Sequence, residues 1–210
     1  MDALRTQIES AWKAEQQDQV LQKVLHTCQP QVARLVDLPE QDAGHKLLEF
    51  VIHYIRALPG LLEDLEMAAA DAGLSSHVEP LVQVAREFFA LPARAIGSRS
   101  GLTALMVKAY LGHRLLEEVN EACLFHTGEP MIPMDMTMAN IIVHTLIGEP
   151  FANDMDSLVN AAVERLFQPA TSEEDGFRTL MSRLEHSNLV HICRRWPSLS
   201  GQAGLYSHPL

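Results

Sequence analysis

Residues 102–125 read LTALMVKAYLGHRLLEEVNEACLF and form the longest uninterrupted helical pattern in the chain. Apolar side chains recur in this stretch at spacings of three and four residues, which places them on one stripe of an α-helix. The sequence ARAIGSRSG precedes it, and Gly128 and Pro130 follow it, so loop-forming residues mark both ends. The pattern predicts a long helix with one buried face.

The rest of the chain has the same periodicity, and no Asn-Gly or Asp-Gly hairpin signal occurs. Helical segments, separated by proline, glycine or capping residues, are predicted at 2–25 (with a break in the polar stretch KAEQQDQ), 42–58, 59–73, 76–91, 102–125, 136–147, 154–168 and 172–195. We therefore expect an all-α fold, a single-domain bundle of about seven to nine helices. The domain is expected to span residues 1–196, and the C-terminal tail, 197–210, to be irregular.

One predicted helix, MTMANIIVHTLI at residues 136–147, carries no charged side chain. A helix without charges on any face is typical of a buried position, so we expect this helix at the centre of the bundle. The uncharged apolar run that contains it, Met136–Gly148, has thirteen residues. A membrane-spanning helix needs about 20, so this segment is predicted to belong to a protein core.

Composition narrows the classes of partner. The chain has 210 residues, 47% of them hydrophobic, and a formal net charge of -11. This balance argues against nucleic acid and against an anionic membrane surface as the main partner, because both require a positive footprint. Three widely spaced cysteines give no disulfide framework and no Cys-x-x-Cys pair, and the charged amino terminus does not resemble a signal peptide. The sequence therefore predicts a cytoplasmic protein.

Polar side chains interrupt the apolar faces of two predicted helices. His113 and Asn120 lie within the apolar stripe of 102–125, with Glu117 beside them, and Asn140 and His144 lie on 136–147. Buried polar groups need hydrogen-bond partners, so these five residues either satisfy one another or surround a ligand. We predict that they line one interior polar pocket for a small ligand. His113, Glu117 and His144 are also candidate ligands for a divalent metal such as Zn, Fe or Mn.

Charge is unevenly distributed along the chain. Residues 115–164 contain nine acids and no Lys or Arg, whereas 88–116 contain four basic residues and no acid. Arg94, Ser98, Arg99 and Ser100 come just before the long helix, whose free N–H groups favour an anion, so they form a second, weaker candidate site. The alternatives are a simple serine cap with solvated arginines and, for the acidic block, a solvated surface.

No nucleotide-binding glycine loop, His-Glu-x-x-His or Gly-x-Ser-x-Gly motif is present. The sequence therefore predicts a helical binding domain with an interior His/Glu/Asn site for a metal ion or small polar ligand. The alternative is a non-enzymatic interaction or regulatory protein that works through its acidic surface or as a helical homodimer. Enzymatic activity stays open, since a His–Glu pair could act as a base.

Overall fold

The computed structural model describes residues 2–39, 41–71, 73–127, 131–132, 134–167 and 198–207. Within these ranges the chain forms eight α-helices and one 3₁₀ helix, and its only strand-like pairing is an isolated bridge between Val36 and Ser207. In chain order the helices are α1 (Asp2–Asp18), α2 (Val20–Val32), α3 (Ala43–Asp71), α4 (Ser75–Ala90), the 3₁₀ helix η1 (Ala93–Ile96), α5 (Gly101–Thr127), α6 (Thr137–Ile147), α7 (Phe151–Phe167) and α10 (Leu199–Gln202). The prediction of an all-α multi-helix bundle is confirmed.

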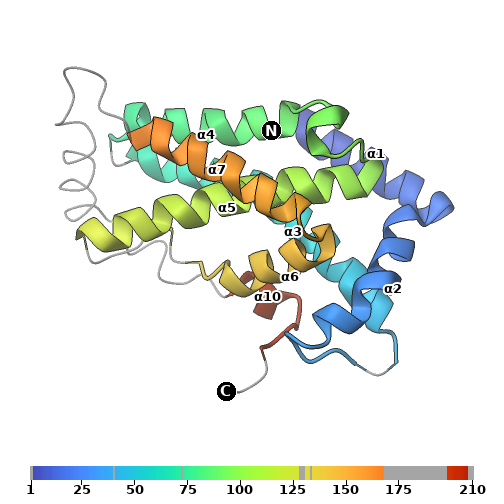
Figure 1. Cartoon of the computed structure of the whole chain (residues 1–210). Helices are drawn as coiled ribbons and strands as arrows, with labels where there is room; N and C mark the ends of the chain where they lie inside the picture. Colours follow the sequence, from blue (N-terminus) through green and yellow to red (C-terminus); the bar gives the residue numbers. More distant parts are fainter. Residues whose placement is uncertain are drawn as a thin grey trace.

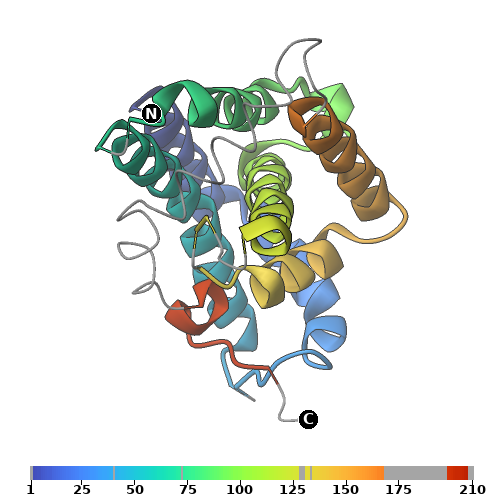
Figure 2. The same ribbon diagram turned by 90° about the vertical axis from the view of Figure 1, so that its left-hand side faces the viewer.

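Helix α5 lies at the centre of the bundle. It crosses the middle of the molecule in Figure 1, and Figure 2 shows it nearly end-on with other helices around it. It packs against α1, α3, α4, α6 and α7, and every residue from 105 to 113 is buried. The helix expected at the centre, α6, buries six of its eleven residues but leaves Ile141 41% exposed. The absence of charge on α6 therefore marks a strongly apolar helix, whereas the central position belongs to a helix that carries charges.

Two helix boundaries illustrate how local signals act. The predicted break in KAEQQDQ occurs at Gln19, which has a positive φ of 50° between α1 and α2. The buried Glu15 carboxylate there accepts hydrogen bonds from the N–H groups of Leu21 and Gln22, which begin α2. In contrast, α3 continues through Pro59, where one predicted helix was expected to end and the next to begin, and apolar side chains on both sides of the proline are buried.

The C-terminal segment 198–207 contains the short helix α10 in the tail that was predicted to be irregular. Leu199 and Leu205 are fully buried, and the Leu199 N–H donates to the Asp135 carbonyl at 3.1 Å. Helix α10 lies beside α6 (Figure 1). Apolar burial therefore orders a segment that has no helical periodicity. The helix predicted at 172–195 lies outside the described residues.

Gly112 allows the central helix to approach α3 closely. A Cβ atom at this position would overlap Cδ2 of Leu58, which is fully buried. This contact lies where α3 packs against α5, the two helices that carry much of the polar cluster described below.

We expect Gly112→Ala to lower the free energy of unfolding by about 1 kcal/mol, since overpacking outweighs the gain in helix propensity. Gly60→Ala is the matched control, because nothing lies within 4 Å of a Cβ there and propensity alone acts. Urea unfolding should give a lower free energy of unfolding than the wild type for Gly112→Ala and a higher one for Gly60→Ala. A stabilising Gly112→Ala would mean that the crossing adapts freely.

Candidate functional site

A chain of buried hydrogen bonds joins three helices in the interior. The Tyr54 hydroxyl on α3 donates to Asn140 Oδ1 on α6 at 2.6 Å. The amide Nδ2 of Asn140 in turn donates to Glu117 Oε2 on α5 at 2.6 Å. All three side chains are buried, and burial raises the pKa of Tyr54 well above its usual value, so the hydroxyl stays protonated and remains a donor. Glu117 and Asn140, two of the five predicted residues, are thus in direct contact.

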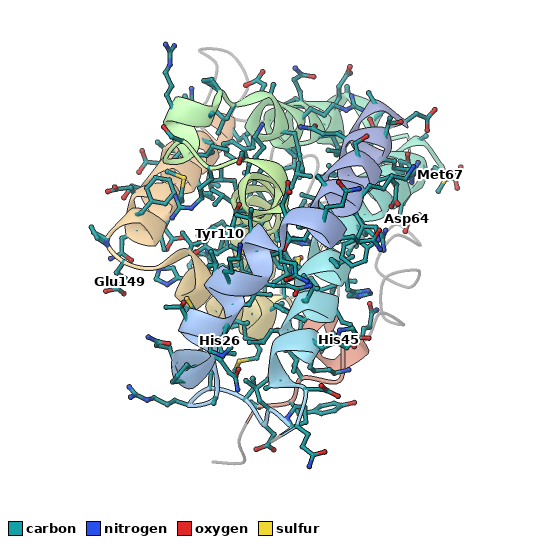
Figure 3. All side chains as sticks on the ribbon, turned by 90° about the vertical axis from the view of Figure 1, so that its right-hand side faces the viewer. His26, His45, Asp64, Met67, Tyr110 and Glu149 are labelled. Atoms are coloured by element: carbon teal, nitrogen blue, oxygen red, sulfur yellow. The ribbon has the colours of Figure 1, made fainter. Side chains whose placement is uncertain are left out.

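Arg114 extends this chain toward α7. Its guanidinium contacts Glu117 and Glu118 one turn along α5, and its Nε lies 3.3 Å from Asp156 Oδ1 on α7. The Tyr110 hydroxyl also donates to Asp156, at 2.6 Å, and Figure 3 shows Tyr110 between the helices. Burial alone would lower the pKa of Arg114, but the contacts with Glu117 and Glu118 outweigh it and raise the pKa. One arginine therefore holds three carboxylates.

His113 lies beside this chain with only one of its ring nitrogens bonded. Its Nε2–H donates to the Tyr54 carbonyl at 2.9 Å, and the His113 and Tyr54 rings lie with their centroids 4.2 Å apart and their planes tilted by 42°. The side chain is fully buried, and Nδ1 has no hydrogen-bond partner among the described residues. Burial lowers the pKa of His113 to about 4, so the ring is neutral at pH 7 with its unpaired acceptor at Nδ1.

The other two predicted residues have separate partners. Asn120 holds the loop after α5, because its amide donates to the Ile132 carbonyl and accepts from the Ile132 N–H, both at 2.8 Å. His144 Nε2 lies 3.0 Å from Asn153 Oδ1 and 3.4 Å from Asp156 Oδ2, and its ring meets the Tyr110 ring edge-on, so it reaches the cluster through Asp156 and Tyr110. The five residues thus occupy one region of the fold, but each side chain already has at least one protein partner.

Metal binding is not supported by this arrangement. Among the described ranges, no group of three or more His, Cys, Asp or Glu side chains is placed to hold a metal ion. His113, Glu117 and His144, the predicted metal ligands, have separate partners: the Tyr54 carbonyl, Asn140 with Arg114, and Asn153 with Asp156.

Sequence reasoning missed several members of the cluster. Arg114 could have been found from its spacing of three and four residues to Glu117 and Glu118, which is typical of ion pairs on a helix. Tyr54 lies on an apolar helix face, where a buried hydroxyl requires a partner. Asp156 gives no local signal, because its partners come from α5 and α6.

A solvent-open groove of about 510 Å³ lies between α1, η1 and the first two turns of α5. Its lining contains no acidic side chain and consists of Gln7, Ser10, Ala11, Ala93, Ile96, Arg99, Ser100, Gly101, Ala104, Leu105 and Lys108. Two of the predicted anion-binding residues, Arg99 and Ser100, therefore line the groove. The other two, Arg94 and Ser98, are exposed and lie outside the lining.

The Arg99 guanidinium is held in a fixed position at one end of the groove. Its two terminal nitrogens donate to the Ile96 and Ile147 carbonyls, both at 3.2 Å, and its carbon lies 4.3 Å from the centre of the Phe151 ring. Gly97 leaves room for it, because a Cβ there would overlap Nη1. Burial lowers the pKa of Arg99, which means that its charge is poorly solvated.

Lys108 is the second cation of the groove, and the sequence analysis assigned it no role. Its side chain is only 8% exposed, and Nζ donates to the Phe89 carbonyl near the end of α4 at 2.7 Å. Burial lowers the pKa of this ammonium. In the part of the chain that the structure describes, neither Lys108 nor Arg99 forms an ion pair with a carboxylate. Lys108 could have been identified from the sequence as a cation that borders the apolar stripe of 102–125.

The two charge blocks of the sequence meet at Arg114. Three of the nine acids in 115–164 contact this one residue of the basic segment. The cations of the groove have only helix carbonyls as acceptors, and a helix C-terminus supplies about half a negative charge. The groove therefore keeps a positive charge that the described residues do not neutralise.

No described helix combines the length and the apolar character that a membrane span requires. No protein-family model matches the chain, and neither a curated protein nor a solved structure shows significant similarity to it.

Proposed function

We propose that this protein is a binding domain for a small anionic ligand, held in the groove between α1 and α5. The observation that carries the proposal is Lys108, a lysine that is 8% exposed and has no carboxylate partner among the described residues, in a groove lined without acids. Charged side chains are almost never buried unless they are paired, because an unpaired buried charge is costly. An anionic ligand would supply the missing counter-charge.

The groove offers further donors at its Arg99 end. A guanidinium has five N–H groups, and two of its nitrogens are occupied by the Ile96 and Ile147 carbonyls. The first N–H groups of α5 begin at Gly101, in the groove lining, and lack intrahelical partners. A carboxylate or phosphate at this end would accept from both.

The test compares two arginine variants of equal charge. Arg99→Met should weaken binding of a carboxylate or phosphate probe about tenfold, the effect of one partly buried charge contact. Arg94→Met removes the same charge from an exposed residue outside the lining, so it should bind as the wild type does. Backbone amide shifts of Ser100 and Gly101 report binding directly. Equal weakening in both variants, or no anion that shifts these amides, would overturn the proposal.

The interior cluster supports a second candidate function, a site for a small polar ligand that donates a hydrogen bond. The specific observation is Nδ1 of His113, a fully buried acceptor for which the described part of the chain provides no partner. A bound hydroxyl or amide there would change the ¹⁵N shift of Nδ1 and leave Nε2 protonated. An Nδ1 shift that no polar ligand changes would leave the cluster with a purely structural role.

The alternative function, protein association through the acidic surface or as a homodimer, is tested on the same sample. Light scattering on a size-exclusion column measures the mass in solution, and a concentration-dependent dimer would favour that alternative. Part of the acidic block is already used internally, since Glu117, Glu118 and Asp156 contact Arg114.

A further inference from the structure

The groove has a cation toward each end and an apolar surface between them. Arg99 lies two residues before Gly101, where α5 begins, and Lys108 lies seven residues beyond Gly101 along this helix, which corresponds to about 10 Å of helix rise. Between them the lining is formed by Ala104 and Leu105 of α5, opposite residues of α1 and η1.

The apolar part of the lining belongs to the core. Ile96 and Leu105 are each 1% exposed, and Ala11 and Ala104 are partly buried beside them. A volume of about 510 Å³ lies within the range of small-molecule sites, far above the space that one inorganic anion fills. An inorganic anion would leave the exposed part of Ala11 and Ala104 hydrated, whereas an apolar chain would cover it and gain free energy by burial.

The charges of the groove call for two anionic groups. Arg99 is held by carbonyls at the ends of η1 and α6, and Lys108 by a carbonyl near the end of α4, and these are their only acceptors among the described residues. The described lining contains no acidic side chain that could neutralise either cation. A ligand with one anionic group would therefore leave one cation unpaired.

We infer that the ligand of the groove is an elongated dianion, with an acidic group at each end and an apolar chain between them, as in a linear dicarboxylic acid. This inference rests on the proposed anion-binding function and specifies its ligand class. One carboxylate binds at Arg99 and the N–H groups at the start of α5, the apolar chain of the ligand covers Ala11 and Ala104, and the second carboxylate binds the Lys108 ammonium.

The experiment measures affinities by calorimetry for adipate, suberate and sebacate, for the matching monoacids hexanoate, octanoate and decanoate, and for inorganic phosphate. The best dicarboxylate should bind about tenfold more tightly than its monoacid, the gain of one additional charge contact. Lys108→Met should abolish this advantage, so that the dicarboxylate and its monoacid bind with equal affinity. Arg99→Met should weaken both ligands, and Lys23→Met, at an exposed lysine outside the groove, should weaken neither.

The outcomes separate the inference from the proposed function. Equal binding of dicarboxylates and monoacids, sensitive to Arg99→Met, would overturn the dianion and keep the anion site. If phosphate binds as tightly as sebacate does, the inference that the ligand has an apolar chain is wrong. No binding of any anion would overturn both. Circular dichroism establishes that Lys108→Met is folded, and Lys108→Arg, which keeps the charge, should retain the preference for dicarboxylates.

Discussion

Replacing Arg114 with methionine is expected to lower the free energy of unfolding by about 3 kcal/mol, near the lower end of the range for breaking a buried ion pair. The guanidinium contacts Glu117, Glu118 and Asp156, and its own side chain is 19% exposed. Without it, three carboxylates from two helices repel one another with no cation between them. Urea unfolding at pH 7 measures the loss directly.

Two variants make this prediction specific. Arg56→Met breaks an ion pair with Glu9 between side chains that are 43% and 52% exposed, so it should cost less than about 1 kcal/mol. Adding Glu117→Gln to Arg114→Met should recover part of the loss, because the neutral amide removes one uncompensated charge and still accepts from Asn140. If Arg114→Met and Arg56→Met cost the same, the α5–α7 cluster does not stabilise the fold.

Acid is expected to destabilise the protein through His113. The pKa of this residue is about 4 in the folded protein and about 6.5 in the unfolded chain. Because the unfolded chain binds the proton more tightly, the stabilisation is complete above pH 6.5 and is lost as the pH falls toward 4. The loss amounts to about 2 kcal/mol between pH 7 and pH 5, and to about 3 kcal/mol below pH 4.

His113→Gln isolates this contribution, since glutamine stays neutral at every pH and keeps an N–H donor for the Tyr54 carbonyl. Unfolding free energies measured from pH 7 to pH 4 should fall less steeply in this variant than in the wild type. His45→Gln removes a histidine that is 68% exposed, at the outer side of the molecule in Figure 3, and should follow the wild-type slope. Parallel slopes for all three proteins would mean that His113 does not govern the acid response.

Much of the fold could be predicted from the residues, because helical periodicity is a local property. The break between α1 and α2 and the order of the helices follow from polar stretches and apolar spacing. The position of Pro59 within α3 could not be predicted, since it depends on the apolar contacts made on both sides of the proline. The same holds for α10, which is ordered by the burial of Leu199 and Leu205 rather than by a pattern in the tail.

For the candidate sites too, some features could be predicted from the sequence and others required the tertiary structure. Periodicity identified Glu117 and Asn140 as buried polar residues on neighbouring helices, and they are hydrogen-bonded to each other. It also marked Arg99 and Ser100 as residues at a helix N-terminus. It gave no reason to connect Glu117 with Tyr54, or Arg99 with Lys108.

The sequence by itself determined the all-α fold, the apolar face of each helix and the polar residues that interrupt those faces. The tertiary structure alone decided which helix is central, which partner each polar group has, and where two cations have no carboxylate partner among the described residues. The physical reason is that spacing along a helix specifies only a face, whereas partners depend on how helices cross. Where α3 packs against α5, for example, Leu58 occupies the space that a side chain at position 112 would need.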